Sequence, residues 1–313
     1  MNVPVYIVTG FLGAGKTRFI TDMLTDEGFS EGEKTLLLCC EEGEEEYDPE
    51  ALKKGNAVLV NLDDPKQIAG KRLMRMNREH QPERVIIEYN ATWLLQTLYN
   101  AEKPDSWALA QIIDLVDAST FEMYLKNMRK YMADGLKEAD LVIFNRCDEN
   151  SRKSPWRRAV KGLNSGTRVF FENLDGTTDD GVADEDLPYD VKADPVTIGD
   201  EDFGTFYLDA MEHPERYDKK VIRAVGQPFP HARLSKGFYF FGRYAMTCCA
   251  NDIQKAGWIC KGSQTPSASA YIRLTARCEK ATDPDGQTAL ILREISAESA
   301  PAPKDKYVTF MNI

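Results

Sequence analysis

A glycine-rich segment near the start of the chain has the residue types and spacing needed to bind phosphate. It reads Gly10-x-x-x-x-Gly15-Lys16-Thr17, between an apolar, β-branched run at residues 3–9 and an amphipathic run at residues 18–24. Glycines let backbone N–H groups turn towards phosphate oxygens, the lysine reaches the β- and γ-phosphates, and the threonine hydroxyl binds Mg²⁺. We therefore predict a strand, a phosphate loop and a helix, with these nucleotide-binding residues: Gly10, Gly13, Ala14, Gly15, Lys16, Thr17 (also a Mg²⁺ ligand) and Arg18.

A second segment, Asn145-Arg146-Cys147-Asp148, follows an apolar run at residues 141–144. Nucleotide-binding folds with a phosphate loop read the base at such a strand end. An aspartate there can accept hydrogen bonds from both N1–H and N2–H of guanine, and adenine has no matching pair of donors. Asn145 and Asp148 are therefore predicted to bind a guanine nucleotide.

Cysteines and a carboxylate in the C-terminal part are candidates for a metal site. Zn²⁺ takes thiolate and carboxylate ligands, and Cys248, Cys249 and Asp252 supply both. Neighbouring residues of an extended strand point to opposite faces, so a shared ion would need a bulge or a turn there. Metal binding, buried structural cysteines and redox chemistry all stay open as interpretations.

The elements that must position these residues alternate along the first half of the chain. Strand-like runs lie at residues 3–9, 35–39, 57–60, 84–88, 107–116, 141–144 and 168–171, and helical patterns lie at residues 18–24, 66–81, 92–100 and 119–139. Alternating strands and helices predict an α/β fold with a doubly wound, mostly parallel sheet of the phosphate-loop NTPase type.

The pattern changes after an acidic stretch. Residues 172–191 contain eight acidic residues and no basic one, which is typical of a solvated linker. Strand-like runs follow at residues 219–225, 237–247, 270–276, 289–295 and 307–311. We expect a phosphate-loop GTPase domain at 1–172, an acidic linker and connecting segment at 173–215, and a smaller β-rich, barrel-like domain at 216–313.

Composition and charge exclude several classes of protein. The 313 residues are 42% hydrophobic and 28% charged, as in a folded globular protein. The net charge of −11 disfavours a nucleic-acid partner, although residues 216–313 carry +7 and the remainder −18. Seven cysteines, two pairs of them adjacent, favour reduced thiols over disulfides. With neither a signal peptide nor a long apolar run evident, we expect a cytoplasmic protein that is not an integral membrane protein.

With both motifs in place, residues 3–172 resemble the CobW-type GTPases, relatives of HypB and UreG. The segments that carry the resemblance are Val8–Thr17, Glu41–Glu44 with Asp48, Ile86–Glu88, Leu115–Ala118, Asn145–Asp148 and Leu163–Gly166. The resemblance implies a slow GTPase that binds GTP and Mg²⁺, in which Lys16 neutralises phosphate charge and Glu88 with Glu41 positions the metal shell or the attacking water. It also places Glu41 and Glu42 near the family's transition-metal site, which would take Zn²⁺ or another transition metal. For most of the seven acidic residues at 41–50, a charged surface turn is the alternative.

Three positions depart from the family pattern. Residues 58–64 contain no cysteine where the family commonly has Cys-x-Cys-Cys. Ala91 replaces a glycine whose amide would approach the γ-phosphate, and Arg146 replaces the lysine of the base-reading motif. The missing cysteines affect the metal site. Ala91 affects the response of the protein to the γ-phosphate, and Arg146 affects the preference for guanine.

The C-terminal region has a resemblance of its own. Residues 217–221, Gly226 and Phe241–Asp252 are similar to the soluble domain of YcgQ-type proteins, which accompany permease-type membrane proteins. Together the two resemblances imply a partner that is a client metalloprotein or a permease-associated protein, and a homodimer is compatible with both.

The first hypothesis is a Mg²⁺-dependent GTPase whose nucleotide state controls delivery of a metal ion or metal cofactor to a client protein. The alternative is a nucleotide-gated regulatory adaptor of a permease or client that hydrolyses little GTP. A small-molecule phosphotransferase is a third possibility, against which Asp148 argues because it selects guanine.

Overall fold

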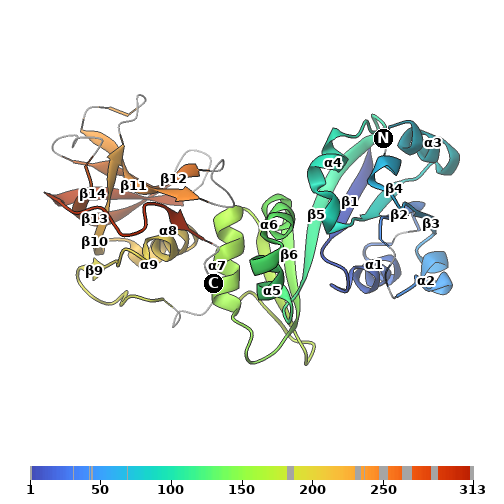
Figure 1. Ribbon diagram of the computed structural model, residues 1–313, viewed down its shortest axis with the longest axis horizontal. Helices are drawn as coiled ribbons and strands as arrows, with labels where there is room; N and C mark the ends of the chain where they lie inside the picture. The colour runs from blue at the N-terminus through green and yellow to red at the C-terminus, as the bar shows by residue number, and fades with distance from the viewer. Residues whose placement is uncertain are drawn as a thin grey trace. The chain divides into compact units, whose positions relative to one another are not determined.

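The computed structural model describes residues 2–30, 32–41, 43, 45–68, 70–181, 187–229, 234–235, 237–246, 253–262, 270–282 and 288–310. Glu42, Cys248, Cys249 and Asp252 lie outside these residues. The chain divides into two compact units, residues 1–182 and residues 183–313, and each contains its own sheet (Figure 1). No helix in the part of the chain that the structure describes is long and apolar enough to cross a membrane.

The first unit is built on one sheet with the strand order β3-β2-β4-β1-β5-β6-β7-β8. All neighbours are parallel except the short β8, which runs antiparallel to β7. The strands are β1 (Val3–Thr9), β2 (Thr35–Cys39), β3 (Ala57–Asn61), β4 (Arg84–Glu88), β5 (Trp107–Asp117), β6 (Leu141–Cys147), β7 (Arg168–Asn173) and β8 (Thr178–Asp179). This arrangement confirms the predicted doubly wound, mostly parallel α/β fold.

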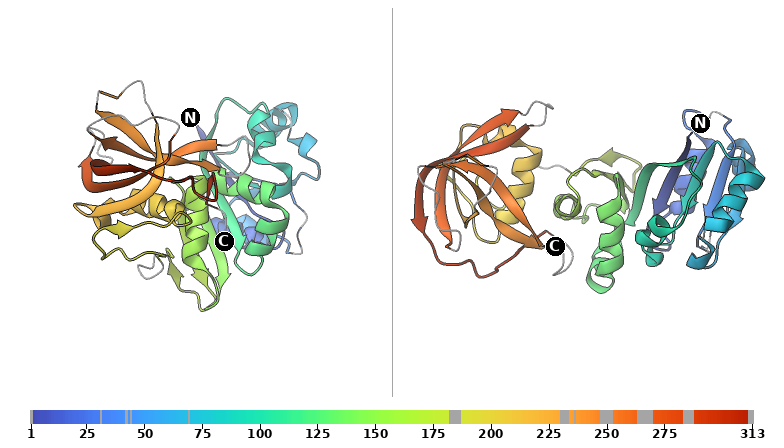
Figure 2. Two further views of the ribbon diagram at one scale, coloured as in Figure 1. Left: turned by 60° about the vertical axis from the view of Figure 1, so that its left-hand side comes forward. Right: turned by 90° about the horizontal axis from the view of Figure 1, so that it is seen from above.

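Helices cover both faces of this sheet, as the views in Figures 1 and 2 show. Ile20 and Leu24 of α1 pack in one core cluster, against which Ile143 of β6 is also packed. Phe144, the next residue of β6, faces the other way and contacts Phe121 of α5 and a tryptophan of α7. The helices are α1 (Lys16–Thr25), α2 (Pro49–Lys54), α3 (Gly70–His80), α4 (Leu95–Asn100), α5 (Phe121–Asn127), α6 (Arg129–Glu138) and α7 (Lys153–Leu163), with 3₁₀ turns at Pro65–Gln67 and Ala91–Trp93.

The position of β1 in the sheet determines where a ligand can bind. β1 lies between β4 and β5, and the chain crosses to β2 on one side and later returns to β5 on the other. In open α/β sheets ligands bind at the carboxyl ends of the strands where the winding changes direction. The loop after β1 therefore occupies the expected binding edge.

The second unit contains a ring of five strands. β10 (Val221–Phe229) pairs with β11 (Phe238–Met246) and with β13 (Ile272–Thr282). β12 (Ile253–Lys261) pairs with β11, and β14 (Thr288–Ser299) pairs with β13. The ring closes where β12 and β14 pair in parallel. Numbered along the chain, the ring has the order 1-2-3-5-4-1, the topology of OB-fold barrels. Figure 2 shows the curved strands of this unit. The predicted smaller β-rich domain is confirmed, and β9 (Val196–Thr197) and β15 (Val308–Thr309) extend its sheet.

Part of the segment expected to be a linker and connecting chain, residues 173–215, has regular structure. It contains β8, β9 and α8 (Phe203–Glu212), and a short helix α9 (Pro214–Tyr217) follows. Phe203 and Phe206 of α8 are almost completely buried, and the Phe206 ring centroid lies 4.7 Å from that of Trp258 in β12. This segment is helical rather than a solvated linker because α8 buries aromatic side chains in the core of the second unit.

Phe206→Ala should lower the free energy of unfolding of the second unit by about 3–5 kcal/mol, because it leaves a cavity among aromatic rings. Calorimetric or denaturant unfolding of the full chain measures this change. Met211→Ala, on the same helix but 41% exposed, is the matched control and should cost far less. Equal losses for the two variants would contradict a core role for α8.

Candidate nucleotide site

The loop between β1 and α1 has the backbone geometry of a phosphate loop. Gly10, Gly13 and Gly15 have φ angles of 139°, 80° and 86°, which L side chains rarely adopt. A Cβ at Gly10 would lie 2.3 Å from the carbonyl oxygen of Leu115. The glycines thus permit a tight turn that ends at the N-terminus of α1, where backbone N–H groups and the helix dipole favour an anion.

Lys16 lies beneath this loop and is almost completely buried. Its Nζ donates to the carbonyl oxygens of Gly10 (2.9 Å) and Phe11 (3.1 Å) and to the carboxylate of Glu41 (2.5 Å). Glu41 follows β2, so the structure brings together two residues that are 25 positions apart in the sequence.

The Thr17 hydroxyl lies beside a buried carboxylate at the end of β4. It donates to Oε1 of Glu88 at 3.1 Å. The other carboxylate oxygen, Oε2, accepts from the Tyr47 hydroxyl (2.5 Å), and the Cys39 sulfur lies 3.4 Å from it. Burial, followed by the charge of Glu88, raises the pKa of Cys39 to about 12, so this group is a thiol at neutral pH. Burial also raises the pKa of the Tyr47 hydroxyl, which keeps the proton that it donates.

The segment predicted to read the base, residues 145–148, is hydrogen-bonded directly to the phosphate loop. Asn145 Nδ2 donates to the Ala14 carbonyl at 2.7 Å, and Arg146 donates to the Gly13 carbonyl at 2.9 Å and to the Asp117 carboxylate at 2.5 Å. Arg146 has φ 54°, an uncommon value for a non-glycine residue. The guanidinium therefore connects the phosphate loop, the end of β5 and the end of β6.

Asp148 is fully exposed at the end of this segment. Its carboxylate accepts from the Ser151 hydroxyl (2.9 Å) and the Asn150 backbone N–H (3.0 Å). Hydrogen bonds, that from Ser151 first, lower the pKa of Asp148, so it is ionised at neutral pH and able to accept hydrogen bonds from a base.

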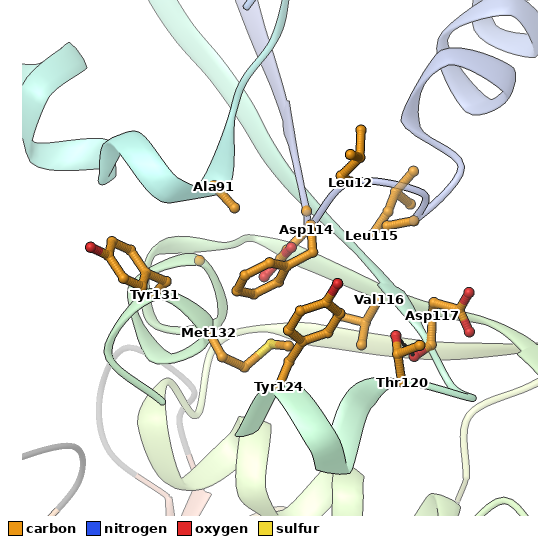
Figure 3. A pocket seen from close by; sticks show the side chains of 14 residues that line it. Leu12, Ala91, Asp114, Leu115, Val116, Asp117, Thr120, Tyr124, Tyr131 and Met132 are labelled. Carbon is orange, nitrogen blue, oxygen red and sulfur yellow. Dashed lines mark hydrogen bonds between the residues drawn. The ribbon is translucent and has the colours of Figure 1, made fainter. Parts of the chain in front are cut away.

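An apolar pocket lies next to the phosphate loop, and Figure 3 shows the side chains that line it. Tyr124, Tyr131 and Met132 line it together with Phe11, whose ring stacks on that of Tyr124 with centroids 4.2 Å apart. Asp114 of β5 also lines the pocket, and burial raises its pKa to about 7 despite the opposing charge of Lys16. The pocket thus combines aromatic walls with the carboxyl groups of Asp114 and Asp117.

Most of the predicted site residues meet at one edge of the first sheet. Gly10, Gly13, Ala14, Gly15, Lys16, Thr17, Arg18, Glu41, Glu88, Asn145 and Asp148 lie at or just after the carboxyl ends of β1, β2, β4 and β6. Arg18 and Thr17 line a hollow together with Glu45, Glu46 and Asp48. Within the described residues, no group of three or more His, Cys, Asp or Glu side chains is arranged to hold a metal ion. The predicted ligands Glu42, Cys248, Cys249 and Asp252 are not among those residues.

Sequence reasoning missed two side chains that this site uses. Tyr47 follows a run of glutamates, and its aromatic type within an acidic stretch was the available signal. Asp114 interrupts the apolar run of β5, where a carboxylate is unexpected. In both cases the signal is one residue, and its partners lie far away in the sequence, so the sequence alone does not show the contact.

Fold and site together define a phosphate-loop nucleotide-binding protein. The family model of the CobW/HypB/UreG nucleotide-binding domain matches residues 4–171, more than half of the chain, and the chain belongs to this family. The model of the DUF1980 C-terminal domain matches residues 175–309.

Comparisons with individual proteins gave more distant likenesses. A search of curated protein sequences gave no match. The chain is similar to the Zn(II)-bound YjiA GTPase from E. coli, with 15% identity, 85% of this chain and 92% of that chain covered, and a TM-score of 0.40. It is also similar to HypB from Helicobacter pylori in complex with nickel (15% identity, 55% and 79% covered, TM-score 0.38) and to HypB from Archaeoglobus fulgidus (12% identity, 56% and 82% covered, TM-score 0.38).

Asp114→Asn should stabilise the first unit increasingly as pH rises from about 4 to about 7. The folded-state pKa is raised above 3.8, so the folded protein binds this proton more tightly than the unfolded chain, and stability falls as pH rises through this window. The amide has no charge to bury, so the variant's advantage should reach on the order of 2–4 kcal/mol above pH 7.

Denaturant unfolding at pH 5 and pH 8 measures this difference. Asp105→Asn, at an exposed position, is the matched control and should show the pH dependence of the parent protein. If the difference in unfolding free energy between Asp114→Asn and the parent protein does not change with pH, the raised pKa of Asp114 is contradicted.

Proposed function

We propose that this protein is a Mg²⁺-dependent GTP-binding protein with slow GTPase activity, which couples nucleotide binding and hydrolysis to the trafficking or insertion of a metal ion or metal cofactor into a client protein. The observation that carries the proposal is a phosphate loop to which a base-reading segment is hydrogen-bonded, in a chain of the CobW/HypB/UreG family.

Guanine selection would depend on Asp148 and Asn145. The Asp148 carboxylate is ionised and exposed, as acceptance from guanine N1–H and N2–H requires. Asn145 is held by the Ala14 carbonyl through its Nδ2, while its buried Oδ1 has no hydrogen-bond partner among the described residues. Arg146 supports the segment in place of lysine, through its bonds to Gly13 and Asp117.

The residues beside the phosphate loop suit Mg²⁺. The Thr17 hydroxyl and the Glu88 carboxylate are hard oxygen donors only 3.1 Å apart, and Mg²⁺ prefers such ligands. When bound, Mg²⁺ neutralises charge on the β- and γ-phosphates. Tyr47 donates to one oxygen of Glu88 and so orients the other towards Thr17. Lys16 would neutralise phosphate charge, and Glu88 with Glu41 would orient the attacking water.

The cargo would be Zn²⁺ or another transition metal. Glu41 and Glu42 are the proposed ligands near the nucleotide, and Cys248, Cys249 and Asp252 are those of the second unit. The absence of cysteine from residues 58–64 means that this chain would hold a metal with ligands other than the family's Cys-x-Cys-Cys.

A nucleotide-gated adaptor is the second candidate. Ala91 and the missing Cys-x-Cys-Cys favour it, because both changes concern the switching and metal parts of the family pattern. The resemblance of the C-terminal region to YcgQ-type proteins points to a permease-associated or client protein as the partner. A cytoplasmic location and a homodimer would suit either candidate.

Purified full-length protein with Mg²⁺ should hydrolyse GTP slowly and ATP much less, and one of Zn²⁺, Co²⁺ or Ni²⁺ should change the rate. Lys16→Ala, which loses the phosphate-binding ammonium, should weaken GTP binding by about a hundredfold or more. Tight GTP binding with no turnover and no response to metals would support the adaptor instead. Unchanged GTP binding by Lys16→Ala would disprove the proposed site.

Asp148→Ala should weaken GTP binding by roughly tenfold to a hundredfold, because it removes a charged acceptor for two guanine donors. ATP binding should change little. Competition of GTP, ATP and ITP against a fluorescent guanine nucleotide measures the selectivity, since hypoxanthine lacks the N2 amino group. Glu149→Ala, at the next exposed position, is the control. Equal losses for GTP and ATP would argue against base reading by Asp148.

A further inference from the structure

Each of the three N–H donors on the Lys16 ammonium already has an acceptor in the protein. Two acceptors are the loop carbonyls of Gly10 and Phe11, and the third is the carboxylate of Glu41. The carbonyls belong to the loop itself and can remain when a phosphate binds. Glu41 is the one anion in this set.

The Lys16–Glu41 pair is shielded from water. The Lys16 side chain is 3% exposed and the Glu41 side chain 12% exposed, with 2.5 Å between Nζ and Oε2. Ion pairs on the surface are weakened by solvent, and this pair is protected from most of that screening. Its charge-assisted hydrogen bond is therefore one that a ligand must break, rather than a loose surface contact.

A nucleoside triphosphate requires the same ammonium. The lysine of a phosphate loop reaches the β- and γ-phosphates, which carry negative charge as the Glu41 carboxylate does. If the carboxylate stayed beside the bound phosphates, like charges would lie close together in a partly buried site, at a cost in free energy. Phosphate binding and the Lys16–Glu41 contact therefore exclude each other.

We propose that Glu41 regulates the nucleotide site as an internal competitor of the terminal phosphates, and that triphosphate binding displaces it from Lys16. This inference rests on the proposed function, because it assigns a regulator to the same site. It gives Glu41 an inhibitory role in binding, in addition to any role in turnover.

Displacement of Glu41 would also affect the groups that contact the acidic segment. The Cys39 thiol donates to the Glu41 carbonyl oxygen at 3.1 Å and lies 3.4 Å from Oε2 of Glu88. Tyr47, six residues after Glu41, donates to the same Glu88 oxygen. The acidic segment, residues 41–48, is thus attached to the phosphate-binding lysine at one end and to the proposed Mg²⁺ carboxylate at the other. Loss of the Lys16 contact removes one of these two attachments of the acidic segment.

The test is binding of a fluorescent guanosine triphosphate analogue to full-length Glu41→Gln, first without Mg²⁺ so that a lost metal contact does not affect the result. The association rate and the affinity should both rise about tenfold, because the amide is neutral and competes poorly for the ammonium. Glu50→Gln makes the same change at a nearby exposed position and should bind as the parent protein does. Thermal unfolding of each variant checks that the fold is retained.

The outcomes separate this inference from the proposed function. If the parent protein binds the nucleotide and Glu41→Gln binds it equally or more weakly, the internal competitor is disproved and the proposed function stands. If neither protein binds the nucleotide even after Mg²⁺ is added, both are disproved. Binding by Glu41→Gln alone, or tighter binding by Glu41→Gln than by the parent protein and Glu50→Gln, supports both.

Discussion

The buried positive charge of Lys16 is the constraint on which the nucleotide site depends. A buried ammonium must be surrounded by acceptors, because its desolvation is otherwise too costly. The left-handed turns at Gly10 and Gly13 allow the loop to wrap around it, and the carbonyls of Gly10 and Phe11 accept from it. Glu41 supplies the countercharge from the end of β2, which is separated from β1 by β4. Loop shape, lysine burial and the position of the acidic segment are therefore parts of one electrostatic arrangement.

The two sides of the site are held in different ways. On the base side, Asn145 and Arg146 bond to loop carbonyls that no phosphate replaces, so this side can stay in place during ligand binding. On the phosphate side, Glu41 and Glu88 bond to Lys16 and Thr17, the groups that phosphate and Mg²⁺ would take. A preorganised base side and an exchangeable phosphate side suit a protein whose conformation responds to its nucleotide.

In the second unit one buried arginine bonds two distant segments to the ring of strands. The ring of five strands encloses a core to which α8 contributes, and Arg243 of β11 is buried with its guanidinium bonded to the carbonyls of Asp200 and Asp305. Those bonds hold the chain before α8 and the chain near the C-terminus against the ring.

The local signals of the sequence determined much of this protein. The strands β1 to β7 follow from apolar runs, and Gly10 to Thr17 specify the phosphate loop because few other residue types can form it. Helix α7 is not among the predicted helices; Pro155 lies in its first turn, where proline is tolerated. Strand β12 was also missed, because Ile253 and Ile259 are exposed on the side opposite the buried Ala256, Trp258 and Cys260, so apolar and polar residues do not alternate cleanly along it.

Only the tertiary structure decided which side chains act together. The pairing of Lys16 with Glu41, the orientation of Glu88 by Tyr47, and the link from Arg146 to Asp117 each join residues far apart in the sequence. No local propensity encodes such contacts, because they arise when parallel strands bring their carboxyl ends to one edge of a sheet. The sequence thus specified the chemical groups, and strand order determined their partners.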